Sequence, residues 1–276
     1  TGCFPRLRML TFGCLFDSYI FRDDLPNNLR RIKFGYRFNR RLSEGVLPNS
    51  VKEIEFGECF NRKLLETSLP TSLERLIFGH NFNRQLKPGD LPKNLRYLMF
   101  GNKFNRPITK GVLPSGLDHL VFGMRFDQEL APGDLPETLR ILVFGFYFNN
   151  SIRRGILPRK LHRIAFGYSF NQHLYEGDLP PTLRSIVLGH MFNQPVHEMV
   201  LPCNLRVLCF GSRFNQPLHE HVLPQILRYL TLGSSYDYPI SINVLPPGLL
   251  RISHCMLNNP VFNEGALPSG TTVNPY

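Results

Sequence analysis

The chain has 276 residues, a net charge of +11 and no tryptophan. Its length would suit one or two globular domains, and a charge of that sign ordinarily points to nucleic acid or an acidic protein as the partner. The sequence contains no run of about 18 apolar residues and no signal-peptide hydrophobic segment. It therefore gives no sign of a part that spans or crosses a membrane.

One pattern of 22 residues recurs along the chain without insertions. The dipeptide Leu-Pro marks it and begins at residues 25, 47, 69, 91, 113, 135, 157, 179, 201, 223, 245 and 267. An unbroken register over this distance requires each copy to occupy an equivalent place in one stacked array. The sequence thus predicts a repeat solenoid that forms a single domain over residues 1–276.

Within the copy at 91–112, apolar residues follow the spacing L-x-x-L-x-F at Leu95, Leu98 and Phe100. Leu98 and Phe100 are two residues apart, so a strand through them points both side chains to the same face. This predicts one short strand per copy, here at about residues 96–100, with Leu98 in an inward column. Nineteen of the 23 phenylalanines lie in two inward columns, those of Phe100 and Phe104, which makes them core residues rather than a base-stacking surface.

Two polar or small positions follow each strand. Gly101 represents a glycine column, which indicates either a positive φ or a backbone too close to its neighbour for a Cβ. Asn105 represents a column of Asn or Asp, whose side chains can bond backbone groups that a turn leaves unpaired. We expect these side chains to form a ladder from coil to coil. The remaining outer segment has no room for a helix and should be turn or extended chain, with a short second strand as an option.

The signature L-P-x-x-L-x-x-L-x-F-G-x-x-F-N-x-P-L, seen in 91–108 and 201–218, closely resembles the FNIP repeat, a relative of the leucine-rich repeat. The resemblance covers residues 3 to about 270. It implies a mainly β, LRR-like right-handed stack of about twelve units with one short parallel strand each. Proteins of this family are abundant in social amoebae and their giant viruses, where the repeats often follow an F-box. The resemblance implies a recognition module, in many cases the substrate-reading arm of a ubiquitin ligase.

The two ends of the array differ. The last copies lose the pattern, so we expect a C-terminal cap over about 250–276. The first copy is close to consensus and would leave an apolar coil end uncovered. We therefore expect that sequence preceding residue 1 is missing, with room for an F-box.

The six cysteines show no spacing that recurs with the repeat and no C-x-x-C motif. A disulfide or zinc framework would repeat with the coils, so we expect isolated, reduced thiols in a cytoplasmic protein, or in the host cytoplasm if the protein is viral. The residues concerned are Cys3, Cys14, Cys59, Cys203, Cys209 and Cys255.

The outward strand positions carry the prediction of a binding surface. From residue 77 to residue 209, the column that contains Met99 is apolar in every copy, although these residues add nothing to the core. Exposed β-branched residues are common in strands, but an apolar stripe this long is larger than scattered surface residues usually give. We expect a protein partner, or a second copy of the chain, on this face. The candidate residues are Ile77, Tyr97, Met99, Val121, Met124, Ile141, Val143, Phe146, Tyr168, Val187, Val207 and Tyr229.

Charged columns suggest two further features. In the second to fourth copies the outward residues alternate in sign, as in Arg31, Glu53 and Arg75, which predicts ion pairs between neighbouring strands. A separate basic row follows the Asn ladder and could meet a polyanion, although a solvated face is the simpler reading. Its members are Arg40, Arg62, Arg84 and Arg106.

Catalysis has little support, because no nucleophile, base and orienting group depart together from the repeat. His197 and Glu198 fall in the same columns as His219 and Glu220 of the next coil, beside His221, at a spacing that could hold zinc, although a solvated loop explains them more simply. We therefore expect a non-enzymatic protein-binding scaffold without cofactor or metal. The alternatives are a polyanion or nucleic-acid binder, with nucleic acid the less favoured partner, and an oligomeric structural protein.

Overall fold

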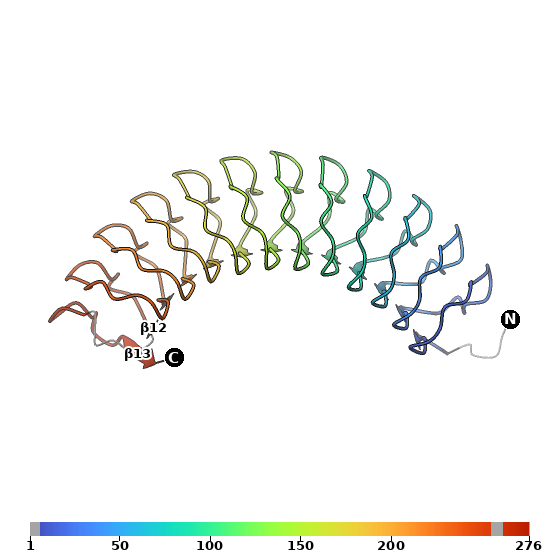
Figure 1. Ribbon diagram of the computed structural model, residues 1–276, viewed down its shortest axis with the longest axis horizontal. Coiled ribbons are helices and arrows are strands. Elements are labelled where there is room, and N and C mark those ends of the chain that lie inside the picture. The colour runs from blue at the N-terminus through green and yellow to red at the C-terminus, as the bar shows by residue number, and fades with distance from the viewer. Residues whose placement is uncertain (1–5, 255–261, 276) are drawn as a thin grey trace. The chain divides into compact units, whose positions relative to one another are not determined.

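The computed structural model describes residues 6–254 and 262–275. The chain divides into two compact units, 1–139 and 140–276, each of which is a stack of similar coils (Figure 1). Cys3, Cys255 and part of the expected C-terminal cap lie outside the described residues. The expectation of a single domain over the whole chain stays a prediction.

Each described coil contributes one short strand, and neighbouring strands within each unit pair in parallel and in register. In the first unit the strands are β1 (Met9–Thr11), β2 (Arg31–Lys33), β3 (Glu53–Glu55), β4 (Arg75–Ile77), β5 (Tyr97–Met99) and β6 (His119–Val121). In the second unit they are β7 (Ile141–Val143), β8 (Arg163–Ala165), β9 (Ser185–Val187), β10 (Val207–Cys209), β11 (Tyr229–Thr231), β12 (Arg251–His254) and β13 (Thr272–Pro275).

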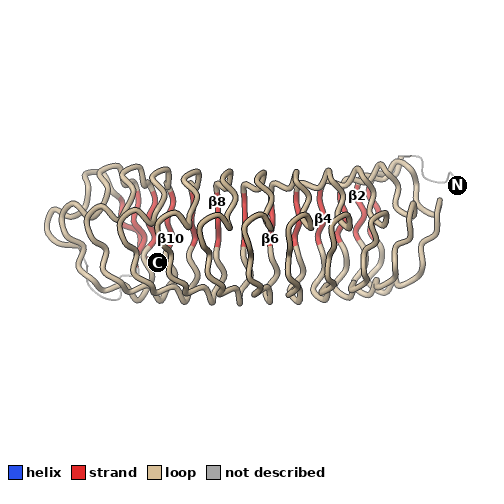
Figure 2. The backbone as a smooth tube through the Cα atoms, turned by 90° about the horizontal axis from the view of Figure 1, so that it is seen from above, coloured by secondary structure: helices blue, strands red, loops and turns tan. Residues whose placement is uncertain are grey.

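The fold class predicted from the repeat is confirmed: this is a parallel β-solenoid of about twelve turns. The described residues contain thirteen strands and no helix, and the strands of each unit lie side by side along one side of its coils (Figure 2). Most strands are three residues long, shorter than the five expected at 96–100. The optional second strand is not found, and outside the named strands the described outer segments make only the isolated bridge Ile240↔Phe262.

The core consists of the predicted inward columns. Leu95 and Leu98 are fully buried, and the phenylalanines of the two aromatic columns stack on one another. Phe78 lies 3.7 Å from Phe82 in its own coil, measured between ring centroids, and 5.8 Å from Phe100 in the next. Each coil therefore buries its apolar face mainly against its neighbours, which is how a solenoid gains stability.

The glycine column is explained by backbone proximity. A Cβ built on Gly101 would lie 1.7 Å from the carbonyl oxygen of Gly79, far inside any permitted contact. Gly79, Gly123 and their equivalents meet the preceding glycine in the same way. The positive φ values belong to a different glycine position on the outer turns, for example 95° at Gly89.

The predicted Asn ladder is present in both units. The side-chain Oδ1 of Asn83 accepts a hydrogen bond of 3.0 Å from the backbone N–H of Asn105. Asn149 accepts the equivalent bond from Asn171 at 2.8 Å. The ladder satisfies one backbone donor per coil at a turn where neither sheet nor helix can do so.

Candidate functional site

In the first unit the outward strand face has a charged part and an apolar part. Arg31 and Glu53 pair at 2.8 Å, and Lys33 and Glu55 pair at 2.6 Å, which confirms the predicted alternation. Arg75 lies 3.4 Å from Glu53 on the other side. The charges of β2–β4 are thus largely satisfied among themselves and are best explained as sheet stabilisation.

The apolar part of this face begins at β4. Ile77, Tyr97 and Val121 are half-buried, and Met99 is exposed. Met124 is also exposed, just beyond the glycine that follows β6. The guanidinium of Arg75 lies 3.6 Å from the centroid of the Tyr97 ring, so the charged part adjoins the apolar part directly.

In the second unit the outward columns remain apolar across several strands. Ile141, Val143 and Val207 are half-buried, while Val187 and Tyr229 are exposed. Their strand neighbours, such as Ile186 and Leu208, are fully buried, so the outward residues are not needed for the core. The structure therefore places these predicted residues on the sheet face that the core does not use.

Beyond the strands of this unit, two exposed rings and the half-buried ring of His190 form a stack. Phe146 and Tyr168 lie 4.4 Å apart with a 4° angle between their planes, and Tyr168 and His190 lie 4.3 Å apart at 8°. Tyr147 meets Phe146 edge-on at 4.9 Å. Phe146 and His190 therefore each cover one face of the Tyr168 ring. Sequence reasoning singled out Phe146 and Tyr168 but missed His190, although its place in the same column was the available signal.

The predicted basic row is part of the Asn ladder. The Nε of Arg62 donates to the backbone oxygen of Asn39 at 2.8 Å, and Arg84 and Arg106 make the equivalent bonds at 2.9 and 3.3 Å. Arg40 also pairs with Asp17 at 2.9 Å. In later coils glutamine occupies this position and donates to the same ladder, as Gln194 does. The row therefore has a structural role that does not require charge.

A shallow depression of about 250 Å³ lies on this row. Three arginines line it, and the guanidinium of Arg40 lies 5.1 Å from the centroid of the Tyr19 ring. The lining is Tyr19, Asn39, Arg40, Arg41 and Arg62. This arrangement could accept a small anion.

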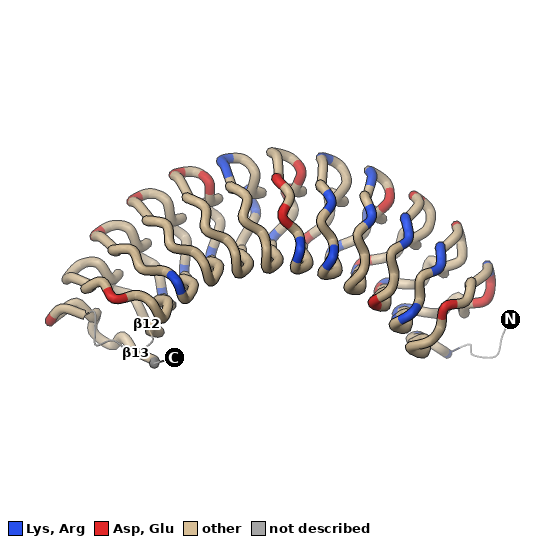
Figure 3. The backbone as a smooth tube through the Cα atoms, in the orientation of Figure 1, with Lys and Arg blue, Asp and Glu red and all other residues tan. Residues whose placement is uncertain are grey.

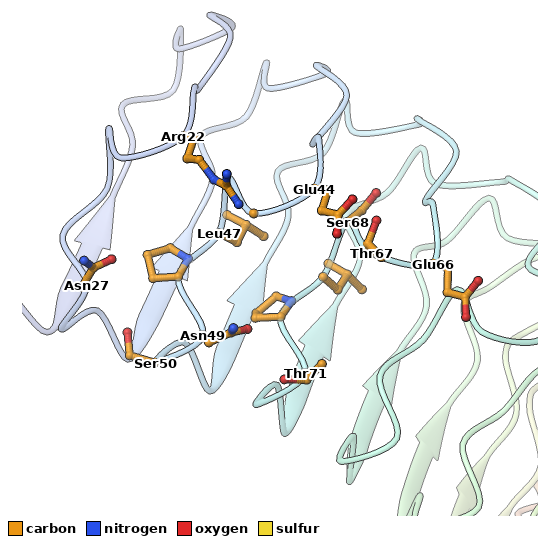
Figure 4. Close-up of a pocket in the computed structure, with 14 residues that line it drawn as sticks. Arg22, Asn27, Glu44, Leu47, Asn49, Ser50, Glu66, Thr67, Ser68 and Thr71 are labelled. Carbon is orange, nitrogen blue, oxygen red and sulfur yellow. The ribbon is translucent and has the colours of Figure 1, made fainter.

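A larger depression of about 580 Å³ lies between outer turns and the segments that lead into β3 and β4 (Figure 4). Arg22, Glu44 and Glu66 lie on one side of it, and Ser50 and Thr71 lie on the other. Its lining offers hydroxyl, amide and charged groups but no aromatic ring. Nothing in this lining arranges a nucleophile with a base and an orienting group.

The described part of the chain contains no candidate metal site and no disulfide. No three His, Cys, Asp or Glu side chains there lie close enough together to hold a metal ion, which includes the candidate at His197, Glu198, His219, Glu220 and His221. Of the cysteines described, Cys14 and Cys203 are exposed, Cys59 and Cys209 are half-buried, and all four are free thiols. No helix among the described residues is long and apolar enough to cross a membrane.

Sequence reasoning also missed a second basic row, which lies just before the strands of the second unit. Arg184, Arg206 and Arg228 occupy equivalent positions in three consecutive coils, and all three are exposed. The signal was the 22-residue spacing itself. Elsewhere in the chain this position is mixed, since it also holds Glu74, Asp118, His162 and Leu250. Charged residues of both signs are distributed over the coils (Figure 3).

Comparison with known proteins agrees with the repeat. The profile of the FNIP Repeat family matches residues 16–59, 60–103, 82–125, 104–136, 126–169, 170–213 and 214–253. Among curated proteins, no sequence matches this chain.

Among solved structures, this chain is similar to CroV588, a giant-virus protein described as having a novel circular LRR structure. The two are 42% identical with a TM-score of 0.93, over 98% of this chain and 40% of CroV588. This chain thus spans about 40% of the length of that protein. The pneumococcal vaccine antigen PcpA is 13% identical over 90% of this chain and 71% of its own, with a TM-score of 0.25.

A leucine-rich repeat protein from Bacteroides ovatus is likewise 13% identical, over 99% of this chain and 76% of its own, with a TM-score of 0.25. TM-scores this low do not indicate a shared fold. The family profile, by contrast, covers residues 16–253 without a gap, which is well over half of the chain. The chain therefore belongs to the FNIP repeat family.

Proposed function

We propose that this chain is a non-enzymatic scaffold that binds a protein partner on the outward face of its strands. The observation that carries the proposal is the apolar character of outward columns whose members contribute nothing to the core. Met99 and Val187 are 37% and 38% exposed, whereas Leu98 and Ile186 beside them are fully buried. An LRR-like repeat fold suits this function, because successive coils present a continuous surface.

The composition of the face also supports partner binding. Tyrosine, methionine and phenylalanine are enriched at the centres of protein interfaces. In the first unit, Tyr97, Met99 and Met124 lie on or beside the outward face. In the second unit, Tyr168 and Tyr229 do so. The ion-paired part at β2–β4 would form a polar rim next to the apolar residues of the first unit.

The proposal is tested by charging the face of each unit separately. One variant combines Met99→Asp with Val121→Lys, and another combines Val187→Asp with Val207→Lys. A control variant combines Leu65→Asp with Met199→Lys, since these exposed apolar residues lie on outer turns away from the strands. Each protein serves as bait, and the bound proteins are quantified alongside the melting temperature.

At least one face variant should lose proteins that the wild type and the control retain, with little change in melting. Sedimentation of the same variants shows whether a second copy of the chain is the partner. Unchanged binding by both face variants, with the fold intact, would reject this surface. Loss of the fold would show that the strand faces are assigned the wrong way round.

A more specific form of the proposal is that the scaffold reads substrates for an F-box-type ubiquitin ligase. The support is the FNIP family membership, because such repeats often accompany an F-box. The full-length protein should then co-purify with cullin-type ligase subunits, and the face variants should retain those subunits while losing substrates. A full-length protein that binds partners without any ligase subunit would contradict this form.

Polyanion binding is the second candidate, favoured by the arginine-lined depression at Arg40, Arg41 and Arg62. The test replaces Arg40, Arg62, Arg84 and Arg106 by glutamine, the residue that later coils use to bond the same ladder. Stability should be nearly unchanged. Binding to oligo(dT) should weaken and lose about 0.7 of salt-dependence slope for each phosphate contact removed. An unchanged slope would rule out this site.

A further inference from the structure

The row Arg184, Arg206 and Arg228, called the arginine row below, places three like charges side by side. The backbone N–H of Arg206 donates to the oxygen of Arg184 at 2.9 Å, and that of Arg228 donates to the oxygen of Arg206 at 2.9 Å. These bonds fix the three residues in register at about the 4.8 Å spacing of paired strands. Like charges so close destabilise a sheet unless something compensates for them.

No carboxylate among the described residues pairs with the arginine row. The corresponding row of the first unit shows the contrast, because Lys52 there pairs with Glu74 at 2.6 Å. Arg228 also donates to the backbone oxygen of Gly248 at 2.8 Å, which orients its guanidinium but leaves its charge uncompensated. The fold itself thus leaves this positive charge free for a ligand.

The apolar residues beside the arginine row place a second requirement on the ligand. Val187, Val207 and Cys209 form an apolar area in the outward columns of β9 and β10. Arg184 precedes Val187 by three residues, or about 10 Å along an extended chain. Two more exposed arginines lie on the same sheet: Arg163 in β8, which pairs with β9, and Arg251 in β12, which β11 separates from the apolar area. A ligand that fits must therefore offer negative charge along one edge and apolar groups about 10 Å away.

The spacing of the coils selects among ligands of this kind. Successive turns of an α-helix are 5.4 Å apart, close to the spacing of the arginines, and a helix is 10–12 Å wide with its side chains. Residues on the same side of an extended peptide are about 6.6 Å apart, so within two coils they would no longer lie opposite the arginines. Nucleic acid is less suited, because its phosphates could meet the arginines but it offers no apolar side chains for Val187, Val207 and Cys209.

We propose that the arginine row and the adjoining apolar area hold an acidic, amphipathic α-helix of a partner protein. The helix lies along the direction in which the coils follow one another, with about one carboxylate per turn facing an arginine. Its apolar stripe packs on Val187, Val207 and Cys209. This inference rests on the proposed function and names the chemistry of the partner. The described residues of a second copy do not supply such a helix, since they contain none.

The experiment selects binders from a displayed library of 18-residue peptides on a helical scaffold, with the surface positions randomised. Selection uses the whole chain and, in parallel, the triple variant Arg184→Gln, Arg206→Gln and Arg228→Gln. A control variant carries Arg40→Gln, Arg62→Gln and Arg84→Gln, which removes the same charge from the first unit. Selected peptides are synthesised, and their affinity for each protein is measured by fluorescence anisotropy at two salt concentrations.

Peptides selected on the wild type should carry Asp or Glu once per turn beside an apolar stripe. Their binding should weaken about tenfold in the triple variant, because each exposed charge pair contributes modestly, and should be unchanged in the control. Selection of neutral or no peptides, equal binding to the triple variant, or preference for oligo(dT) over every peptide would overturn the inference. If Val187→Asp with Val207→Lys abolishes partner capture while the triple variant does not, the proposed function stands and this inference fails.

Discussion

At the scale of single residues, the distance between coils decides which side chains the fold permits. The nearest backbone atom to a Cβ at Gly101 would lie 1.7 Å away, whereas a Cβ at Gly13, which no described coil precedes, meets nothing within 4 Å among the described residues. Both glycines occupy the same column, so they differ in what lies against them rather than in their place in the repeat. The chain thus contains its own control for the cost of close backbone approach.

Replacing Gly101 by alanine should lower the free energy of unfolding by about 3 kcal/mol or more, because the coils must separate to admit the methyl group. Gly13→Ala should change it by less than about 0.5 kcal/mol. Urea unfolding followed by circular dichroism measures both. Equal effects of the two substitutions would show that φ, and not proximity, selects glycine in this column.

Tyr236 is an exception in a column that is otherwise phenylalanine through most of the chain. Its side chain is 1% exposed, and its hydroxyl makes no hydrogen bond to the described residues. Burial raises the pKa of this phenol to about 12, and the nearby Leu218 backbone opposes the rise without reaching hydrogen-bond geometry. A buried hydroxyl without a partner costs stability.

Tyr236→Phe should therefore raise the free energy of unfolding by about 1 kcal/mol at pH 7. The raised pKa means that the folded state holds the phenol proton more tightly than the unfolded state does. The stability linked to that proton is complete below pH 10 and is lost as the pH rises through about 12. The difference between variant and wild type should thus widen above pH 10. A variant less stable than the wild type at pH 7 would imply that the hydroxyl has a partner.

At the scale of elements, the Asn ladder replaces the hydrogen bonds that the chain cannot make at its turns. Asn39, Asn61 and Asn83 each accept the backbone N–H of the next coil through their side-chain oxygen. Asp17 accepts the same bond from the backbone N–H of Asn39 at 2.8 Å through its side-chain oxygen, so aspartate can take the place of asparagine in the column. The function of the position is therefore to supply an acceptor, which either side chain can do.

Asn83→Ala should lower the free energy of unfolding by about 1–3 kcal/mol, since it leaves the N–H of Asn105 without an acceptor. Asn83→Asp should cost less than about 1 kcal/mol, because the acceptor oxygen remains. Chemical denaturation and amide exchange at Asn105 measure the two effects. Unprotected exchange at Asn105 in the wild type would contradict the ladder.

The elements differed in how far sequence could predict them. Inward residues such as Leu98 and Phe104 were predicted because burial constrains every coil alike. The strand at 97–99 was placed correctly but made too long, since the turns at Pro92 and Gly101 limit pairing at both ends. Sequence alone predicts the basic row as a surface separate from the ladder. The bonds from Arg62 and Arg84 to the ladder depend on contacts between neighbouring coils, which the sequence does not reveal.

At the scale of the molecule, both units follow one rule: each coil packs on the next, and every coil leaves the same outward positions to solvent. The repeat fixes what faces inward, so the fold could be predicted from spacing alone. The repeat does not determine which residue types face outward, since residues as different as Lys33, Glu55 and Met99 occupy the same outward strand position. The binding surface is therefore proposed from composition and exposure, and its partner from charge and spacing.

The neighbouring residues Leu98 and Met99 test the central claim most directly, because they lie on opposite faces of β5. The measurement pairs the free energy of unfolding with the retention of captured partners for Leu98→Ala and Met99→Ala. The account predicts a loss of about 2–5 kcal/mol for Leu98→Ala. For Met99→Ala it predicts a change of less than about 0.5 kcal/mol together with weakened partner binding. A Met99→Ala variant that is as destabilised as Leu98→Ala, or that is stable and binds unchanged, would contradict the claim that the outward face is reserved for a partner.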